Sequence, residues 1–251
     1  MRYLEGESLC RQIAMGRLQF YRRERYEIRR DSLLRPEQEE KRFFSAQKHA
    51  VQELNAHYER AEALLGEVGA SIFAIHAMLL EDEDLTEQVC TLIREEGVTA
   101  EHAIHAVGRQ VAETFSQMEN PYMRARAADI QDIVRRMELR LLNRHPDHRL
   151  AERPTILVSN YFLPSEVMEL PHRRILGVVT TGGSVDSHTA QLFQACGIPA
   201  LVGVPMEKDW EGRVALLDGY SGRLYLEPDQ ELTEQLRLAY ETGGRPELAE
   251  I

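Results

Sequence analysis

Residues 180–204 read TTGGSVDSHTAQLFQACGIPALVGV, and this stretch decides the class of fold. The apolar run ILGVV at 175–179 comes before it and predicts a buried strand. A glycine-rich turn follows, a helix is predicted to begin at Ser187 and His188, and GIP at 197–199 leads into a second apolar strand. A strand, a glycine-rich turn and a helix N-terminus together form an anion site, because backbone N–H groups and the positive end of the helix dipole point at the loop. A histidine in the first helical turn is therefore placed to take up a phosphoryl group.

The same pattern also occurs in an ordinary buried strand–turn–helix with an incidental histidine, and a glycine pair before a histidine would by itself favour that interpretation. The spacing from Ser187-His188 to GIPALVG at 197–203 reverses the preference. The segment resembles the phosphohistidine domain of the phosphoenolpyruvate-utilising proteins, which have glycines, Ser-His, a small-residue helix and Gly-Ile-Pro-Ala in this order. The resemblance implies that His188 is the phospho-acceptor through its Nε atom. It places four residues in the phosphate loop: Gly182, Gly183, Ser184 and Ser187.

Composition predicts a cytoplasmic protein of ordinary globular type. The chain has 251 residues, 43% hydrophobic and 28% charged, enough for one large domain or two smaller ones. No apolar run approaches ~20 residues and the N-terminus lacks the apolar core of a signal peptide, so neither a membrane span nor export is expected. Cys10, Cys90 and Cys196 are scattered and odd in number, which predicts reduced thiols. The net charge of −11 argues against nucleic acid or an anionic membrane as a partner and suits a basic protein.

A helical block is predicted over residues 31–144. Apolar residues recur every seven positions, at Phe44, Val51, Tyr58 and Leu65, with Leu54, Ala61 and Val68 interleaved. This spacing predicts a long helix with one apolar seam. A shorter helix leads into the acidic run EDED at 81–84, which opens the next helix, and Gly97 is predicted to end that one. Thr99 is the predicted N-cap of a third helix, and apolar residues at three-four spacing over 127–141 predict a fourth.

Short strands are predicted after Pro154, at residues 155–159, 175–180, 200–204, 214–218 and 223–226. Residues 3–6 and 13–21 are strand-like too, so the N-terminal piece is expected to join this region. The predicted fold class is α/β plus α, with a phosphohistidine swivelling β/β/α domain and an inserted helical bundle. The domain boundaries are 1–30 and 145–228 for the swivelling domain, 31–144 for the helical insertion and 229–251 for a linker-like helix.

Two stretches of the helical block, IHAMLLEDEDL at 75–85 and YMRARAADI at 122–130, resemble enzyme I of the sugar phosphotransferase system. In that family, named phosphoenolpyruvate-protein phosphotransferase, the helical subdomain docks the phosphocarrier protein HPr. An acidic run alone would indicate only a solvated helix start, but here it is in register with the other matching stretches. A dikinase-type mobile domain is disfavoured because the helical blocks of the dikinases differ from this one. The resemblance implies an HPr-like partner and a partner-binding face made of His76, Met78, Leu79, Glu83, Asp84, Tyr122 and Arg126.

The departures from the family pattern cluster around the histidine. Val185-Asp186 stand in place of Arg-Thr, and Ser184 stands in place of a glycine. Gln194 replaces an arginine, and Leu163 replaces a threonine that orients the active histidine. The lost arginines leave less positive charge for a phosphoryl dianion, and Asp186 adds a like charge.

Two hypotheses about function therefore stay open. The first is an enzyme I-type phosphotransfer domain that acts covalently through His188 and exchanges phosphate with the carrier. The second is a degenerate regulatory or binding module that docks a carrier and transfers nothing. No metal and no cofactor are expected in this chain, because Mg and phosphoenolpyruvate would need the barrel domain that follows in enzyme I. The chain is expected to be a fragment, to work with a separate phosphoenolpyruvate-binding barrel, or only to exchange phosphate with its carrier.

Overall fold

A computed structural model describes residues 2–145 and 150–241, which form two compact units. The sheet unit comprises Met1–Arg23, His148–Phe162 and Leu170–Ile251, and the helical unit comprises Glu24–Asp147 and Leu163–Glu169. These bounds differ from the ones expected from the sequence. Residues 24–30 and 163–169 group with the helices, and the helical unit extends to Asp147. The C-terminal helix groups with the sheet and is not a separate linker.

The sheet unit contains one mixed sheet, and this confirms the predicted α/β class. Its strands in chain order are β1 (Arg2–Glu5), β2 (Glu7–Ser8), β3 (Ile13–Phe20), β4 (Thr155–Ser159), β5 (Ile175–Thr180), β6 (Ala200–Val202), β7 (Val214–Asp218) and β8 (Arg223–Leu226). Their order across the sheet is β1-β8-β7-β3-β4-β5-β6-β2. The central strands β3, β4, β5 and β6 are parallel, and the strands outside them are antiparallel to their neighbours. The carboxyl ends of the parallel strands therefore lie along one edge, where α/β proteins commonly bind ligands.

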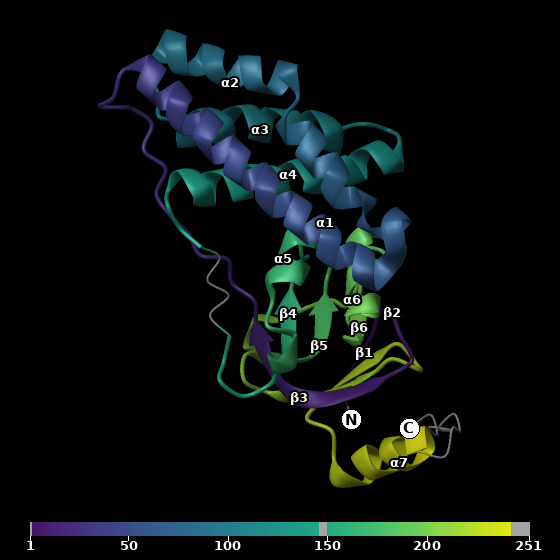
Figure 1. Cartoon of the computed structure of the whole chain (residues 1–251). Helices are drawn as coiled ribbons and strands as arrows, with labels where there is room; N and C mark the ends of the chain where they lie inside the picture. Colours follow the sequence, from purple (N-terminus) through teal and green to yellow (C-terminus); the bar gives the residue numbers. More distant parts are fainter. Residues whose placement is uncertain (1, 146–149, 242–251) are drawn as a thin grey trace. The chain divides into compact units, whose positions relative to one another are not determined.

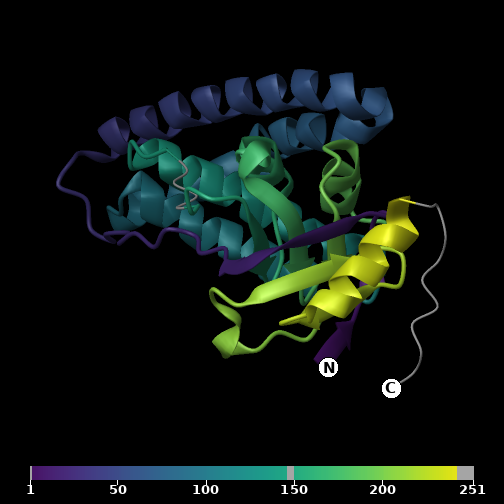
Figure 2. The same ribbon diagram turned by 90° about the horizontal axis from the view of Figure 1, so that it is seen from below.

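Two helices accompany the sheet, α6 (His188–Ala195) and α7 (Gln230–Glu241). Figure 2 shows α7 lying along the strands near the C-terminal end of the described chain. Leu232 and Leu236 of α7 pack with Leu216 and Tyr225 of the sheet. This contact is the reason why α7 belongs to the sheet unit: its apolar side is buried against strands, as in an ordinary amphipathic helix.

The helical unit contains α1 (Pro36–Leu80), α2 (Glu83–Glu96), α3 (Ala100–Ser116), α4 (Pro121–Leu141) and the short α5 (Pro164–Glu169) (Figure 1). The predicted helix signals are confirmed. Asp82 caps α2 by accepting a hydrogen bond from the N–H of Leu85 at 3.0 Å, and Gly97 ends α2 in the left-handed conformation with φ +64°. Thr99 caps α3 through the N–H of His102.

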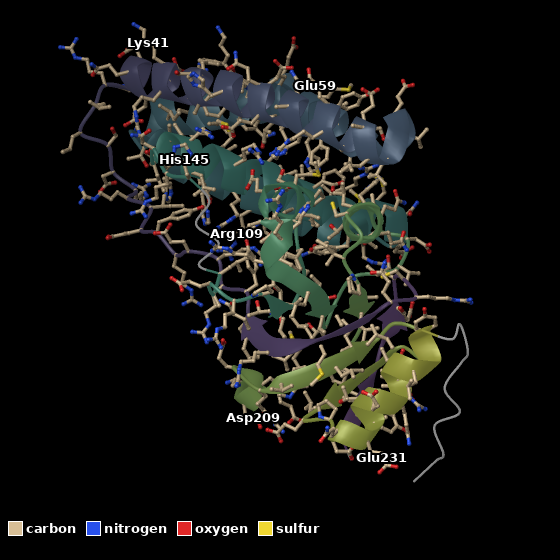
Figure 3. All side chains as sticks on the ribbon, turned by 60° about the horizontal axis from the view of Figure 1, so that its bottom comes forward. Lys41, Glu59, Arg109, His145, Asp209 and Glu231 are labelled. Atoms are coloured by element: carbon tan, nitrogen blue, oxygen red, sulfur yellow. The ribbon has the colours of Figure 1, made fainter. Side chains whose placement is uncertain are left out.

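The buried side of α1 agrees with the predicted seam in part. Leu54 and Ala61 of that seam are buried, and Val68 is exposed. In the other half of the seam, Phe43, Ala50 and His57 are buried in place of Phe44, Val51 and Tyr58. This half was assigned one residue out of register, which turns a helix by about 100°. Figure 3 shows Lys41 and Glu59 on the outward side of this helix.

Gly66 interrupts α1 with φ +72° and ψ 174°, so the chain makes two helical segments that meet at a kink. Among the described residues, α1 is also the single helix long and apolar enough, by length and composition, to cross a membrane. The apolar segment after Gly66 has room for roughly 21 Å of helix at 1.5 Å per residue, whereas a bilayer core is about 30 Å thick. Its buried residues, among them Phe73 and His76, are those of a helix packed within the helical unit.

A buried polar network joins α1, α4 and α5. Arg136 of α4 donates from Nη2 to Glu169 Oε1 at 2.7 Å and from Nη1 to Glu53 at 2.7 Å. His57 Nε2 lies 3.1 Å from the same Glu169 oxygen, and Arg60 donates to His57 Nδ1. Asp132 of α4 also accepts the N–H of Ser165 at 3.0 Å. These contacts explain why residues 163–169 belong to the helical unit.

A histidine at the entrance of helix α6

His188 is the first residue of α6, half-buried, directly after the loop that leaves β5. The N-cap is Ser187, whose Oγ accepts the N–H of Ala190 at 3.2 Å and donates to the carbonyl of Ser184 at 2.8 Å. The predicted helix start is therefore confirmed. A helix of eight residues presents its N-terminal N–H groups and the positive end of its dipole at this point.

The loop before the helix is held by the end of β4. The N–H of Gly182 donates to the carbonyl of Asn160 at 2.8 Å, and that of Thr181 donates to Ser159 at 3.2 Å. Gly183 has φ +100°, a conformation that side-chain-bearing residues rarely adopt, so a glycine is required there. Thr189, the residue after His188, donates from its hydroxyl to the carbonyl of Phe162 at 3.3 Å. The loop and the first helical turn are thus both anchored on residues 159–162.

All of the predicted phosphate-loop residues lie on this one turn, but their side chains have different surroundings. Gly183 and Ser184 are exposed, and Gly182 is half-buried. The hydroxyl of Ser187 is engaged in the helix cap, so its part in the turn is structural.

The residues that depart from the family pattern also have definite places. Asp186 is exposed two residues before His188, and Val185 is half-buried. Gln194 donates from its side chain to the carbonyl of Leu9 at 2.5 Å, so it ties α6 to the segment after β2. Leu163 is buried in the helical unit, and its N–H donates to Glu166 at 2.9 Å. None of these four side chains carries a positive charge.

Two residues near the loop were not singled out from the sequence. Asn160 supplies the carbonyl that holds Gly182, and its side-chain oxygen lies 3.4 Å from the Thr181 hydroxyl. Arg23 donates to the carbonyl of Tyr161 at 3.0 Å, and its guanidinium carbon lies 4.5 Å from the centre of the Tyr161 ring. A polar residue directly after a buried parallel strand was the available signal for Asn160. The run YRRER at the end of β3 was the signal for Arg23.

The predicted partner-binding face lies in the helical unit and is only partly assembled as expected. Met78 has 72% of its surface exposed, Leu79 is half-buried, and Glu83 and Asp84 are exposed in the first turn of α2. Apolar atoms and carboxylates are therefore accessible together at the junction of α1 and α2. Tyr122 is in the first turn of α4, and its side chain lies outside the described part of the structure.

The expectation that His76 belongs to this face is wrong. Its side chain is fully buried, because residues two apart on a helix point about 200° apart and Met78 occupies the outward side. The ring lies between two carboxylates of α4, with Nε2 3.2 Å from Asp129 and Nδ1 3.6 Å from Asp132. Arg126 is also mostly buried and pairs with Asp129 at 2.9 Å. Burial would raise the pKa of Asp129, but hydrogen bonds and charge from His76 and Arg126 outweigh it and lower that pKa. His76 is thus a buried residue of the helical core and contacts Asp129 and Asp132 there.

The site at His188 is equipped for nucleophilic chemistry on an anion. A neutral imidazole protonated on Nδ1 presents the lone pair of Nε2, and the helix N-terminus stabilises negative charge beside it. Among residues 2–145 and 150–241, no group of three His, Cys, Asp or Glu side chains could hold a metal ion.

Comparisons with known proteins match both units. Residues 5–126 match the family described as PEP-utilising enzyme, N-terminal, and residues 151–222 match that described as PEP-utilising enzyme, mobile domain. A phosphoenolpyruvate-protein phosphotransferase of Haemophilus influenzae is 33% identical over 213 residues, and one of Lactococcus lactis subsp. lactis is 32% identical over 207 residues. These matches cover 84% and 81% of this chain. The chain spans only 37% and 36% of those two relatives.

Two solved structures resemble the whole chain. An NMR solution structure of enzyme I (nEIt) has a TM-score of 0.70 and 28% identity, and the match covers 96% of this chain and 99% of that one. The N-terminal domain of Enzyme 1 - Nitrogen has a TM-score of 0.62 and 25% identity, and covers 95% of this chain and 99% of its own. The match therefore extends over the sheet and the helices alike.

Proposed function

Since this chain belongs to the PEP-utilising enzymes, with the fold of the enzyme I N-terminal domain, we propose that it takes up a phosphoryl group on His188 from an HPr-like carrier and returns it. The position of His188 is the observation that carries the proposal. His188 is the first residue of a capped helix that directly follows a glycine-rich loop, and it lies in the segment that matches the mobile domain. The two relatives from Haemophilus influenzae and Lactococcus lactis are phosphoenolpyruvate-protein phosphotransferases.

The transfer step follows from these groups. The Nε2 lone pair of neutral His188 attacks the phosphorus of a phosphohistidine on the carrier, and a new N–P bond forms while the carrier's N–P bond breaks. The electron pair of the broken bond stays on the carrier's ring nitrogen. The Nδ1 proton of His188 balances part of the new charge, and the N-terminal N–H groups of α6 stabilise the phosphoryl oxygens. The reaction is reversible because both sides are phosphohistidines.

The proposed partner is a basic carrier protein that docks on Met78, Leu79, Glu83 and Asp84. Exposed apolar atoms flanked by carboxylates suit an apolar patch ringed by basic groups. The similarity to enzyme I supports a place for this reaction in the phosphotransferase system and a cytoplasmic location for the protein. Use of phosphoenolpyruvate itself would require the remainder of the relatives' length, whether on this chain or on another.

The test is incubation of the protein with a phosphorylated HPr, followed by intact-mass measurement at neutral or alkaline pH, since phosphohistidine is labile in acid. We expect one phosphoryl group on the wild-type protein and none on His188→Ala. The matched control is His49→Ala, which removes an exposed histidine of α1 and should leave the labelling unchanged. Labelling that persists in His188→Ala would reject the assignment.

One observation favours the second candidate, a module that docks a carrier without transfer. Residues 175–195 contain no Lys or Arg, and Asp186 is exposed beside the histidine. An unlabelled wild-type protein that still binds the carrier through α1 and α2 would establish this candidate in place of the first.

A further inference from the structure

The proposed docking face is divided between two helices. Met78 and Leu79 lie in the last turn of α1, and Glu83 and Asp84 lie in the first turn of α2. Two residues connect the helices, and we call residues 78–86 the corner. The apolar and the acidic parts of the face keep their relative positions only if the corner is held. This inference rests on the docking proposed above, and asks which residue holds the corner.

The connecting residues bond either to one helix or to the other. The N–H groups of Glu81 and Asp82 donate back to carbonyls of α1, at 3.1 and 3.4 Å. The second of these distances is longer than an ordinary N–H···O hydrogen bond. The side chain of Asp82 caps α2, as described above. These bonds end α1 and begin α2, and the orientation of one helix relative to the other depends on further contacts.

A side chain from the first segment of α1 supplies such a contact. Gln47 donates from Nε2 to the carbonyl of Leu80 at 2.8 Å and to Oγ1 of Thr86 at 3.2 Å. The nitrogen must face Leu80, because a carbonyl oxygen only accepts hydrogen bonds. The last carbonyls of a helix have no partner within it, so a side-chain donor is well used there. One amide group therefore joins three pieces: α1 before Gly66, the end of α1, and the first turn of α2.

The two sides of the corner differ in how they are held. The end of α1 is anchored from beneath, since the buried ring of His76 lies 3.2 Å from Asp129 of α4 and Leu80 is fully buried. The start of α2 is more open, and both Glu83 and Asp84 are exposed. A shift of the first turn of α2 would therefore move the two carboxylates away from the apolar part of the face.

We propose that Gln47 is a positioning residue of the docking face. Through its bonds to both sides of the corner, it holds Glu83 and Asp84 beside Met78 and Leu79 in the arrangement that a basic carrier with an apolar patch binds. Gln47 itself needs no contact with the carrier. Its hydrogen bonds are already formed in the free protein, so the carrier does not have to order the corner on binding.

A second link between the same two helices offers a matched comparison. Arg94 donates from Nε to Glu40 Oε1 at 2.8 Å, which joins α2 to α1 far from the corner in the sequence of both helices. The double variant Glu40→Gln/Arg94→Gln removes this link and keeps the net charge of the chain. A residue that only stabilises the contact of α1 with α2 would behave like this pair, whereas a residue that positions the docking face would not.

The first experiment measures the kinetics of docking. Unphosphorylated HPr is mixed with the full chain in a stopped-flow instrument, and thermal melting shows that each variant is folded. We expect Gln47→Ala to lower the association rate constant about two- to tenfold, the range of one net hydrogen bond, because fewer molecules have the assembled face. The dissociation rate constant should stay near that of the wild type. Met78→Ala, which removes a contact, should mainly raise the dissociation rate constant. Glu40→Gln/Arg94→Gln should match the wild type in both.

The second experiment tests the bond to Thr86. Thr86→Val removes the hydroxyl at nearly constant shape, and Thr86→Ser keeps it. Thr86→Val should slow association, Thr86→Ser should not, and Gln47→Ala should cost less in the Thr86→Val background than in the wild type. In the free protein, Gln47→Ala should shift the NMR amide signals of residues 83–86, and Glu40→Gln/Arg94→Gln should leave them in place.

The outcomes separate this inference from the proposed function. A wild type that binds no HPr refutes the docking proposal, and the role of Gln47 falls with it. A wild type that binds, together with Gln47→Ala that associates equally fast, refutes the role of Gln47 and leaves docking standing. Equal slowing by Gln47→Ala and by Glu40→Gln/Arg94→Gln, or strict additivity of Gln47→Ala with Thr86→Val, would also overturn it.

Discussion

At the scale of single residues, the carboxylate of Glu169 connects the stability of the helical unit to pH. Burial alone would raise its pKa, but the hydrogen bond with His57 and the charge and hydrogen bond of Arg136 outweigh burial and lower the pKa to about 2. Burial lowers the pKa of His57, and the charge of Arg136 acts in the same direction against the carboxylate of Glu169. The ring of His57 is therefore neutral at neutral pH, and Arg136 is the cation that balances Glu169.

Substitution of Glu169 by Gln should destabilise the protein at neutral pH by about 2–3 kcal/mol, because the buried Arg136 loses its counter-charge. A carboxyl group with a lowered folded pKa stabilises above its unfolded pKa, and this contribution is lost as pH falls from about 4.5 toward about 2. The difference between wild type and variant should therefore shrink over this range. Urea unfolding at a series of pH values measures it.

The matched control for that prediction is Glu59→Gln, which removes an exposed carboxylate from the outward side of the same helix, α1. It should change stability by less than about 0.5 kcal/mol. The pKa of His57 is lowered in the folded state, so the unfolded chain binds a proton more readily. The wild type and Glu59→Gln should therefore also lose stability as pH falls below about 6.5, the ordinary pKa of a histidine. A pH-independent difference between wild type and Glu169→Gln would contradict the assignment of the charge to Glu169.

The sequence predicted the positions of some functional residues correctly and the surroundings of others incorrectly. The positions of Ser187 and His188 followed from local chemistry, since an N-cap and a glycine turn are determined by neighbours in the chain. The burial of His76 depended on Asp129 and Asp132, more than fifty residues away, and no local pattern specifies that contact. The same holds for Arg23, whose partner Tyr161 lies 138 positions later in the sequence.

At the scale of elements, α3 and α4 pack closely because a glycine faces a valine. An added methyl group at Gly108 of α3 would overlap Cγ2 of Val134 in α4. We expect Gly108→Ala to destabilise by about 1–3 kcal/mol through overpacking, in spite of the better helix propensity of alanine.

A double-mutant cycle tests that contact. Val134→Ala shortens the opposing side chain, so Gly108→Ala should cost much less in the Val134→Ala background than in the wild type. Chemical denaturation of the four proteins gives the coupling. Strictly additive effects would show that the two side chains do not limit the helix–helix approach.

Elements were predicted well where the signal was local, and less well where it depended on orientation. The strands and helix caps lie within a residue or two of their expected places, because glycine, proline and capping residues mark the ends. The half of the α1 seam that begins at Phe44 was assigned one residue out of register, since Phe43 and Phe44 are adjacent and either one begins a seven-residue repeat. Residues 163–169 are too short for a periodic pattern, and ionic contacts with α1 and α4 decide where they belong.

At the scale of the whole molecule, the net charge of −11 favours a basic partner, and the exposed side chain of Met78 on the helical unit is available for apolar contact. Both features make the docking proposal testable. Met78→Ala should weaken the binding of a basic HPr-like carrier by about 1–2 kcal/mol if Met78 lies at the centre of the interface. Glu83→Lys should mainly slow association, and affinity should fall as salt rises. Titration calorimetry and stopped-flow measurements give these values.

The control for docking is Val68→Ala, which truncates an apolar side chain that is 87% exposed on the same helix near Gly66. It lies outside the proposed face and should leave affinity and melting unchanged. Carrier-induced NMR shifts confined to the sheet unit would contradict a docking face on α1 and α2.

Because α5 belongs to the helical unit, residues 24–147 alone do not encode that unit completely. A polypeptide cut to residues 24–147 would contain α1 to α4 but not LPSEVME at 163–169, and would leave Arg136 and His57 facing water or one another where Glu169 had been. We expect this polypeptide to unfold in less urea than the helical unit of the intact chain. A synthetic peptide with the sequence of residues 163–169 should restore part of the loss when added in excess, and the same peptide with Gln in place of Glu169 should not. The helical unit is thus formed by two segments that are separate in the sequence, and strand β4 of the sheet unit lies between them.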